Sequence, residues 1–276
     1  MEKTLDPNPE ANTYGATVSP KVYPSITQAF ALIGILILIS IILAFPAYWL
    51  KHHIDSQYEP AFESILYVVS IVMLLLFAFA MRKSVKLQWK KVSWEVLLLT
   101  IPLILSLYIL NDPLDSIIPM PDFFTNMYNQ TYPVNLYSIL AFCIAAPLFE
   151  EMIFRGIVLQ GFLKRYSPTK AILVSALIFS LAHLNPVQFL TAFTLGLLLG
   201  WIYWKTNSLL SSIFIHACNN ILAFSIQSMT NDLFSFQKAM GEAKIYYIVY
   251  GMCIPIFIGT LFFIDYKIKS KKSETA

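Results

Sequence analysis

The stretch that decides the fold is AFCIAAPLFEEMIFRGIVLQGF, residues 141–162, which is apolar except near its centre. Glu150, Glu151 and Arg155 stand there, where a membrane-spanning helix would hold them inside the bilayer. A charged side chain at the bilayer centre costs roughly 2.5–3.5 kcal/mol even on the most lenient insertion scale. These three residues are therefore the first functional-site hypothesis.

The composition of the whole chain is that of an integral membrane protein. Of its 276 residues, 57% are hydrophobic and 13% are charged, whereas about 25% of residues are charged in a soluble domain. The net charge of +3 is spread over short basic clusters between apolar runs. That pattern is a topology signal, and we expect no nucleic-acid partner. Cys143, Cys218 and Cys253 lie in apolar segments and are interpreted as small hydrophobic residues.

The hydropathy pattern predicts an all-α, polytopic membrane protein with about eight transmembrane helices. A span needs about 20 predominantly apolar residues. The candidates are residues 28–50, 62–81, 94–110, 135–163, 171–184, 187–204, 209–229 and 245–266. The fifth is short and runs into Asn185-Pro186, so we expect it to form a tight hairpin with the sixth.

The distribution of lysine and arginine predicts the orientation of these helices. Four basic segments fall on one side of an eight-helix topology: 82–91, 164–170, the turn at 205, and 267–272. We assign this side to the cytoplasm, which makes both termini cytoplasmic; Lys51 and Lys244 fall on the other side. The compact single domain and basic tail favour a bacterial plasma membrane.

The same topology places the polar residues of three helices at one depth. At a rise of 1.5 Å per residue, Glu150 and His183 lie roughly 21 and 20 Å from the basic loops, and His216 and Asn220 lie roughly 16 and 22 Å away. Polar residues with unrelated structural roles need not lie at the same depth. We expect a cavity at this level that opens toward the basic, cytoplasmic side.

The two adjacent glutamates are predicted to have different roles. Glu151 and Arg155 are separated by four residues on one helix face, in the order that favours an ion pair. Glu150 points about 100° away and has no partner on its own helix. Pro147, one turn earlier, frees the carbonyl of Cys143 and predicts a kink just before the glutamates.

The two later spans add a second set of candidates. His183 ends the run FSLAH, and His216 and Asn220 share a helix face in HACNN, with Asn219 off that face. With Glu150, these side chains could activate water and stabilise an oxyanion. The alternative is a His₂Glu zinc site formed by Glu150, His183 and His216.

Three motifs in this chain resemble those of a known family. They are Glu150-Glu151-Met-Ile-Phe-Arg155, Phe179-Ser-Leu-Ala-His183 and His216-Ala-Cys-Asn219-Asn220. In this order they resemble the EExxxR, FxxxH and HxxxN motifs of the CAAX-protease and bacteriocin-processing (CPBP) family of intramembrane proteases, which includes type II prenyl endopeptidases and Abi-like proteins. The resemblance covers about residues 135–225, whereas the first hundred residues match only as generic spans.

The resemblance implies an intramembrane endopeptidase. In that family the first glutamate, here Glu150, activates the water that attacks the scissile amide. His216 and Asn220 would stabilise the oxyanion, His183 would hold or polarise the water, and Glu151 with Arg155 would support the site. The family is often labelled as metalloproteases, yet this mechanism needs no metal, so we expect no required cofactor and keep zinc as the alternative.

The resemblance also divides the chain. Residues 1–25 are expected to be a disordered cytoplasmic tail, and 26–134 to be N-terminal transmembrane helices. Residues 135–230 form the predicted catalytic core, with four to five helices that carry the motifs, and 231–276 hold the last span and a basic tail. The expected partners are the lipid bilayer and a protein or peptide substrate that enters from the membrane or the cytoplasm.

Two other functions stay open at this point. One is a non-proteolytic immunity or scaffold protein of the same fold. The other is a proton-coupled transporter that uses Glu150 as a protonatable site, although the inverted repeats or paired broken helices typical of transporters are not evident. The Gly196-x-x-x-Gly200 pair in the sixth span is interpreted as close helix packing.

Overall fold

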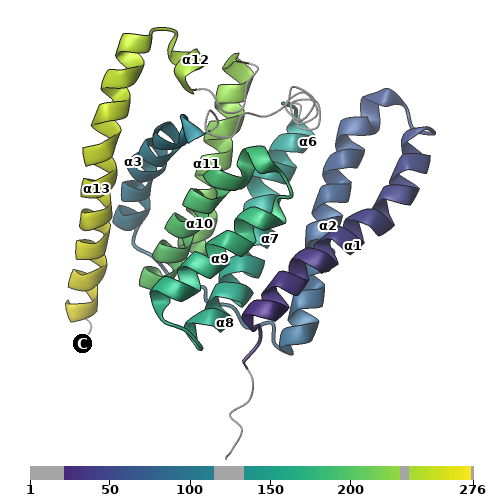
Figure 1. The fold of residues 1–276 in the computed structure, drawn as a ribbon, viewed down its shortest axis with the longest axis horizontal. Helices are drawn as coiled ribbons and strands as arrows, with labels where there is room; N and C mark the ends of the chain where they lie inside the picture. The colour runs from purple at the N-terminus through teal and green to yellow at the C-terminus, as the bar shows by residue number, and fades with distance from the viewer. Residues whose placement is uncertain (1–21, 115–133, 231–235, 275–276) are drawn as a thin grey trace, which may run out of the picture.

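The computed structural model describes residues 22–114, 134–230 and 236–274, and these form a bundle of helices (Figure 1). The long elements are α1 (Ile26–Lys51), α2 (Glu59–Arg82), α3 (Trp94–Asn111), α9 (Pro168–Ala182), α10 (Pro186–Thr206), α11 (Leu209–Thr230) and α13 (Ala243–Glu274). Short elements are η1 (Ser56–Tyr58) and α12 (Phe236–Met240). The prediction of an all-α polytopic membrane protein is confirmed.

Six helical segments of the described chain are long and apolar enough to cross a membrane: 26–50, 56–82, 94–111, 136–163, 209–229 and 243–270. α9 and α10 are not among them. With 15 residues, α9 rises only about 22 Å, which is less than the hydrocarbon thickness of about 30 Å. The expected tight hairpin is present, because Leu184 adopts a left-handed conformation (φ 52°) between the two helices.

The fourth predicted span is one continuous helical segment with two π-helical stretches. It consists of α6 (Leu136–Ile139), η2 (Leu140–Ala145), α7 (Ala146–Ile153), η3 (Phe154–Leu159) and α8 (Gln160–Leu163), of which η2 and η3 are π-helical. Pro147 lacks the N–H that would bond the carbonyl of Cys143, and the N–H of Ala146 reaches back five residues to Ala141. Where a kink is predicted, just before the glutamates, the structure has a π-helical stretch, a feature frequent at functional sites.

The four basic segments lie together at one end of the bundle, which we call the basic end (Figure 1). The carbonyl of Lys90 accepts a hydrogen bond from Ser208 in the turn after α10. Lys205 forms an ion pair with Asp265 near the C-terminal end of α13. These contacts join the loop after α2, the α10–α11 turn and the end of α13, as the charge pattern predicts.

The chain enters the bundle at the basic end. Ser25 caps α1 in a reciprocal capping box with Gln28. Pro24 packs so closely against α8 that a Cβ at Gly161 would lie 2.5 Å from its ring. Residues 22–25 are thus packed, and residues 1–21 of the predicted disordered tail lie outside the described residues. At the other terminus, α13 continues to Glu274, beyond the predicted boundary at 266.

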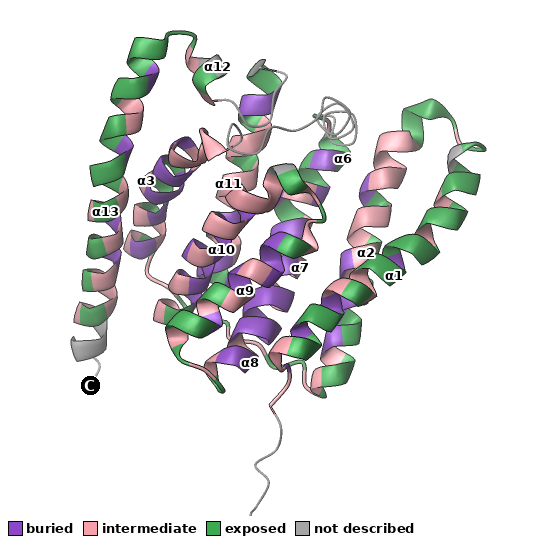
Figure 2. Cartoon of the chain, viewed as in Figure 1, coloured by how far each residue is buried: buried purple, intermediate pink, exposed green. Residues whose placement is uncertain are grey.

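The buried core lies in the central helices (Figure 2). α7, η3, α9, α10 and α11 carry many of the fully buried side chains, among them Ile153, Ile157, Leu159 and Leu199. In contrast, α1 and α13 expose large apolar side chains such as Phe45 and Phe262. These outer faces suit contact with lipid, and the motif-bearing helices occupy the protected interior.

Candidate active site

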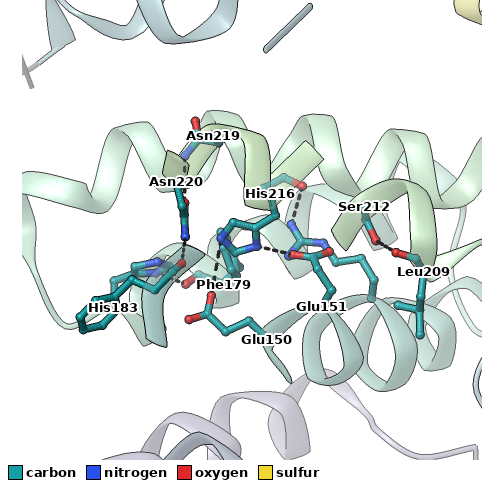
Figure 3. A network of polar contacts seen from close by, with 12 residues as sticks. Glu150, Glu151, Phe179, His183, Leu209, Ser212, His216, Asn219 and Asn220 are labelled. Carbon is teal, nitrogen blue, oxygen red and sulfur yellow. Dashed lines mark hydrogen bonds and ion pairs between the residues drawn. The ribbon is translucent and has the colours of Figure 1, made fainter. Parts of the chain in front are cut away.

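The residues predicted for the site come together in the structure (Figure 3). Glu150 and Glu151 lie on α7, between the two π-helical stretches, and Arg155 follows in η3. His216 comes from the middle of α11. Their exposed fractions are 8% for Glu150, 0% for Glu151, 1% for Arg155 and 3% for His216. Four ionisable groups are therefore removed from solvent in one cluster.

Glu151 holds two of these groups at once. Its Oε1 accepts hydrogen bonds from Arg155 Nη1 at 2.8 Å and from His216 Nδ1 at 2.9 Å. The predicted ion pair is thus confirmed, and it extends to α11. Because the carboxylate accepts from Nδ1, this nitrogen carries a hydrogen, and Nε2 of His216 lies on the other side of the ring.

Arg155 extends the same cluster to α9 and α10. Its Nη2 donates to the carbonyl of Gly196 at 3.1 Å, and its guanidinium lies 4.4 Å from the centre of the Phe179 ring. A Cβ at Gly196 would lie 3.1 Å from Cα of Ala176, so the glycine permits the close packing of α10 on α9. Gly196 is therefore a packing residue, as predicted, but it has a second role that the sequence did not indicate: its carbonyl accepts a hydrogen bond from Arg155.

Phe179 explains the aromatic position of the FxxxH motif. Its ring is edge-on to His183 at 4.8 Å and to His216 at 5.7 Å between ring centres. Its carbonyl bonds Nδ1 of His183 at 2.9 Å. A carbonyl only accepts, so Nδ1 of His183 is the donor. Phe179 thus sets the position of both histidines and fixes which nitrogen of His183 is left for other partners.

The two asparagines of α11 have different surroundings. Asn220 Nδ2 donates to the carbonyl of Phe142 in η2 at 2.7 Å, and its Oδ1 accepts from Asn219 Nδ2 at 3.2 Å. The amide of Asn220 is thus oriented from two sides and retains a second N–H. Asn219 was set aside from sequence because it lies off the His216 face, and in the structure it contacts the Asn220 side chain.

Glu150 is held quite differently from Glu151. Its Oε1 accepts a hydrogen bond from the hydroxyl of Tyr67 in α2. Its Oε2 is buried, has no hydrogen-bond partner among the residues that the structure describes, and lies 4.0 Å from Nε2 of His216. Sequence reasoning missed Tyr67, because a single tyrosine in an apolar span carries no motif and no partner at helical spacing.

Glu150 and both histidines line a cavity of about 470 Å³. Its polar lining consists of Ser40, Tyr67, Ser70, Tyr108, Asn111, Asp112, Glu150, His183, Gln188, Thr191, His216, Asn219 and Asn220. Leu36, Leu43 and Ala47 of α1 add an apolar wall. The cavity therefore combines a polar surface at the cluster with an apolar surface opposite, as in many sites for organic ligands.

The expectation that the cavity opens toward the basic end is wrong. The parts of α1, α2, α3, α10 and α11 that line it are the halves remote from the basic loops, represented by Ala47, Ser70 and Asp112. Between the site and the basic end, Ile157, Leu159, Phe162 and Leu209 are fully buried. The rise per residue predicts that the site residues lie at one depth, but it does not predict which half of the bundle is packed with side chains and which half contains the cavity.

The zinc alternative stays a prediction, and the arrangement of the described side chains does not support it. Within residues 22–114, 134–230 and 236–274, no three His, Cys, Asp or Glu side chains are grouped so that they could hold a metal ion. Glu150 and His216 face each other, whereas His183 lines the same cavity without joining them as a third ligand. We therefore derive no chemical step through a metal.

Comparison with known proteins agrees with the motifs. Residues 132–222 match the family model described as Rce1-like, type II CAAX prenyl endopeptidase Rce1-like. This range holds Glu150, His183, His216 and Asn220 but not Tyr67. No curated protein and no solved structure matches the chain. The multiple apolar helices and the family match show an integral, multi-pass membrane protein, and the match over residues 132–222 supports membership of this part of the chain in the CPBP family of CAAX-type proteases.

Proposed function

We propose that the protein is an intramembrane endopeptidase in which Glu150 activates the attacking water. One observation carries the proposal: Glu150 lines the cavity, and its Oε2 is buried and has no hydrogen-bond partner among the described residues. A buried carboxylate oxygen normally has a partner, and its lack is expected where the oxygen must bind a reacting group. The family match supplies the reaction class, peptide-bond hydrolysis.

The separation of Glu150 and His216 supports a place for the water. Oε2 and Nε2 are 4.0 Å apart, which is too far for a direct hydrogen bond but suits one water about 2.8 Å from each atom. Such a water would be bound by a general base on one side and by an imidazole on the other. That is the geometry a base-activated nucleophile requires.

The chemistry uses one proton and needs no other reactant. Glu150 removes a proton from the water while the water oxygen forms a bond to the scissile carbonyl carbon. The carbonyl oxygen then becomes an oxyanion. The C–N bond then breaks, and the proton on Glu150 passes to the leaving amine. The carboxylate is thereby regenerated, and the water is divided between the two products.

The oxyanion would be stabilised by donors that are already oriented. We assign this role to protonated Nε2 of His216 and the second N–H of Asn220, and we assign His183 to holding the substrate or the water. Glu151 stabilises the His216 imidazolium through Nδ1, and Arg155 orients Glu151. Fixed donors in a buried site stabilise developing charge without reorganising during the reaction.

The orientation in the membrane belongs to the same proposal. The excess of lysine and arginine at the basic end supports a cytoplasmic location for this end and for both termini. The cavity is then reached from the opposite half of the bilayer, so the substrate is a peptide segment that enters from the membrane or from that face. We place the protein in a bacterial plasma membrane and propose that it acts without a metal.

The experiment compares wild-type protein with Glu150→Gln, both reconstituted in lipid vesicles. Each is incubated with a peptide library in water enriched in ¹⁸O, and new peptide ends are identified by mass spectrometry. We expect new C-termini that carry one ¹⁸O atom with the wild type and not with Glu150→Gln. Equal yields of the same ends with both proteins would refute Glu150 as the base, and cuts without ¹⁸O would refute direct attack by water.

A further inference from the structure

Tyr67 forms a hydrogen bond with Glu150, the proposed base, and lies in none of the three family motifs. It comes from α2, outside the matched range of 132–222. Its hydroxyl donates to Glu150 Oε1, and its ring lines the same cavity as Glu150 and His216. The N-terminal half of the chain therefore reaches the centre of the site through one polar atom.

We infer that Tyr67 is the positioning residue that makes Glu150 Oε2 the reactive oxygen. This inference rests on the proposed role of Glu150. A carboxylate has two equivalent oxygens, and rotation about the last bond of the side chain exchanges them. The hydroxyl of Tyr67 binds Oε1, so the other oxygen is held toward Nε2 of His216, 4.0 Å away.

The position of the Tyr67 hydroxyl is itself fixed by packing. The Tyr67 ring lies against Phe142 with 4.8 Å between ring centres. The carbonyl of Phe142, in η2, accepts the hydrogen bond of Asn220 at 2.7 Å. Phe142 therefore has two roles. Its ring packs against Tyr67, which orients the proposed base, and its carbonyl orients Asn220, a proposed oxyanion donor.

This arrangement explains why the base needs a partner from another helix. Glu150 has no partner on its own helix, because Arg155 is occupied by Glu151 and Gly196. A buried carboxylate that makes no hydrogen bond carries a large desolvation cost. A single donor at Oε1 reduces that cost while it leaves Oε2 open, whereas a donor to each oxygen would block the reaction.

The test is a double-mutant cycle between Tyr67→Phe and Glu150→Gln in the same vesicles, with a peptide that the wild type cleaves. Tyr67→Phe removes the hydroxyl but keeps the ring against Phe142. We expect kcat to fall about 10-fold to 100-fold, the range for loss of a hydrogen bond to a charged group, while KM stays the same. In the Glu150→Gln background, Tyr67→Phe should cause almost no further loss.

The matched control is Tyr137→Phe, at a half-exposed tyrosine of α6 that does not line the cavity; its kcat should equal that of the wild type. Wild-type kcat in Tyr67→Phe would overturn the inference. So would a loss confined to KM, or a loss of equal size in both backgrounds. Failure of the underlying proposal is distinguishable, because Glu150→Gln alone would then retain full activity.

Discussion

The two halves of this bundle are built differently, and the two adjacent glutamates lie at the boundary between them. Toward the basic end, Ile157, Leu159 and Leu209 are fully buried in the interior. Toward the opposite end, the same helices surround a cavity of about 470 Å³. Glu151 is buried away from the cavity and Glu150 lines it. Glu151 thus belongs to the packed half of the bundle, and Glu150 belongs to the half that contains the cavity.

The difference lies in how the oxygens of the two carboxylates are used. Glu151 Oε1 joins Arg155 and His216, and through Arg155 it joins α10. Glu150 accepts a hydrogen bond at Oε1, whereas its Oε2 has no hydrogen-bond partner in the described part of the chain. A tightly paired buried charge contributes rigidity and position, whereas an unpaired oxygen in a cavity is available for chemistry. The predictions below test this division.

The largest effect is expected from removal of the arginine that neutralises Glu151. Arg155→Ala leaves a buried carboxylate without its charge partner, which costs about 3–5 kcal/mol, and the unfolding temperature in detergent should fall clearly. The double variant Glu151→Gln with Arg155→Gln should recover part of the loss, because both buried charges are removed. Arg165→Ala, at an exposed arginine of the basic end, is the control. An Arg155→Ala protein as stable as this control would contradict the account.

The next effect concerns the two asparagines of α11. Asn220→Ala removes a proposed oxyanion donor and should lower kcat about 10²-fold to 10³-fold. Asn219→Ala only releases one contact to the Asn220 amide, so its loss should be much smaller. Steady-state kinetics of both variants on one peptide decide the matter. Equal losses, or a greater loss for Asn219→Ala, would reverse the assignment.

The direction of the cavity can be tested by cysteine labelling in a background in which the three native cysteines are replaced by alanine. Ala47→Cys lines the cavity and should react with a membrane-impermeant thiol reagent from the face opposite the C-terminus. Ile157→Cys, in the filled half, should stay unreactive from both faces. Labelling of Ile157→Cys from the basic end would show that the filled half contains a path for water.

The smallest effect is expected from chelation. Because Glu150 and His216 are not joined by a third ligand, we expect activity to persist after treatment with a strong chelator. Elemental analysis of the same active sample provides the stoichiometry. One zinc per chain, with activity lost on chelation and regained on addition of zinc, would make Glu150 a ligand rather than a base.

Much of the fold and half of the cluster could be predicted from sequence, for a physical reason. Apolar length and helical spacing are local properties, so they predict the helices and the Glu151–Arg155 pair, whereas Pro147 predicts a kink where the structure has a π-helical stretch. The link from Glu151 to His216 spans 65 residues in sequence. No pattern within one helix specifies which faces of α7 and α11 meet, so this link appears only in the structure.

The features missed from sequence depend on how separate helices meet. Tyr67 reaches Glu150 across 83 residues of sequence, and its apolar neighbours in α2 give it no distinguishing pattern. The filled and hollow halves are also invisible in a hydropathy profile, since the same apolar residues suit a packed core, a cavity wall and a lipid-facing surface.

The most direct test of the central claim is the same substitution made at two consecutive positions. Glu150→Gln and Glu151→Gln are compared for kcat on one peptide and for unfolding temperature. The account predicts that Glu150→Gln loses about 10²-fold to 10⁴-fold in kcat, the range for a general base, with little change in unfolding temperature, whereas Glu151→Gln is clearly less stable. A Glu150→Gln protein that retains near-normal kcat, or that unfolds as readily as Glu151→Gln, would contradict it.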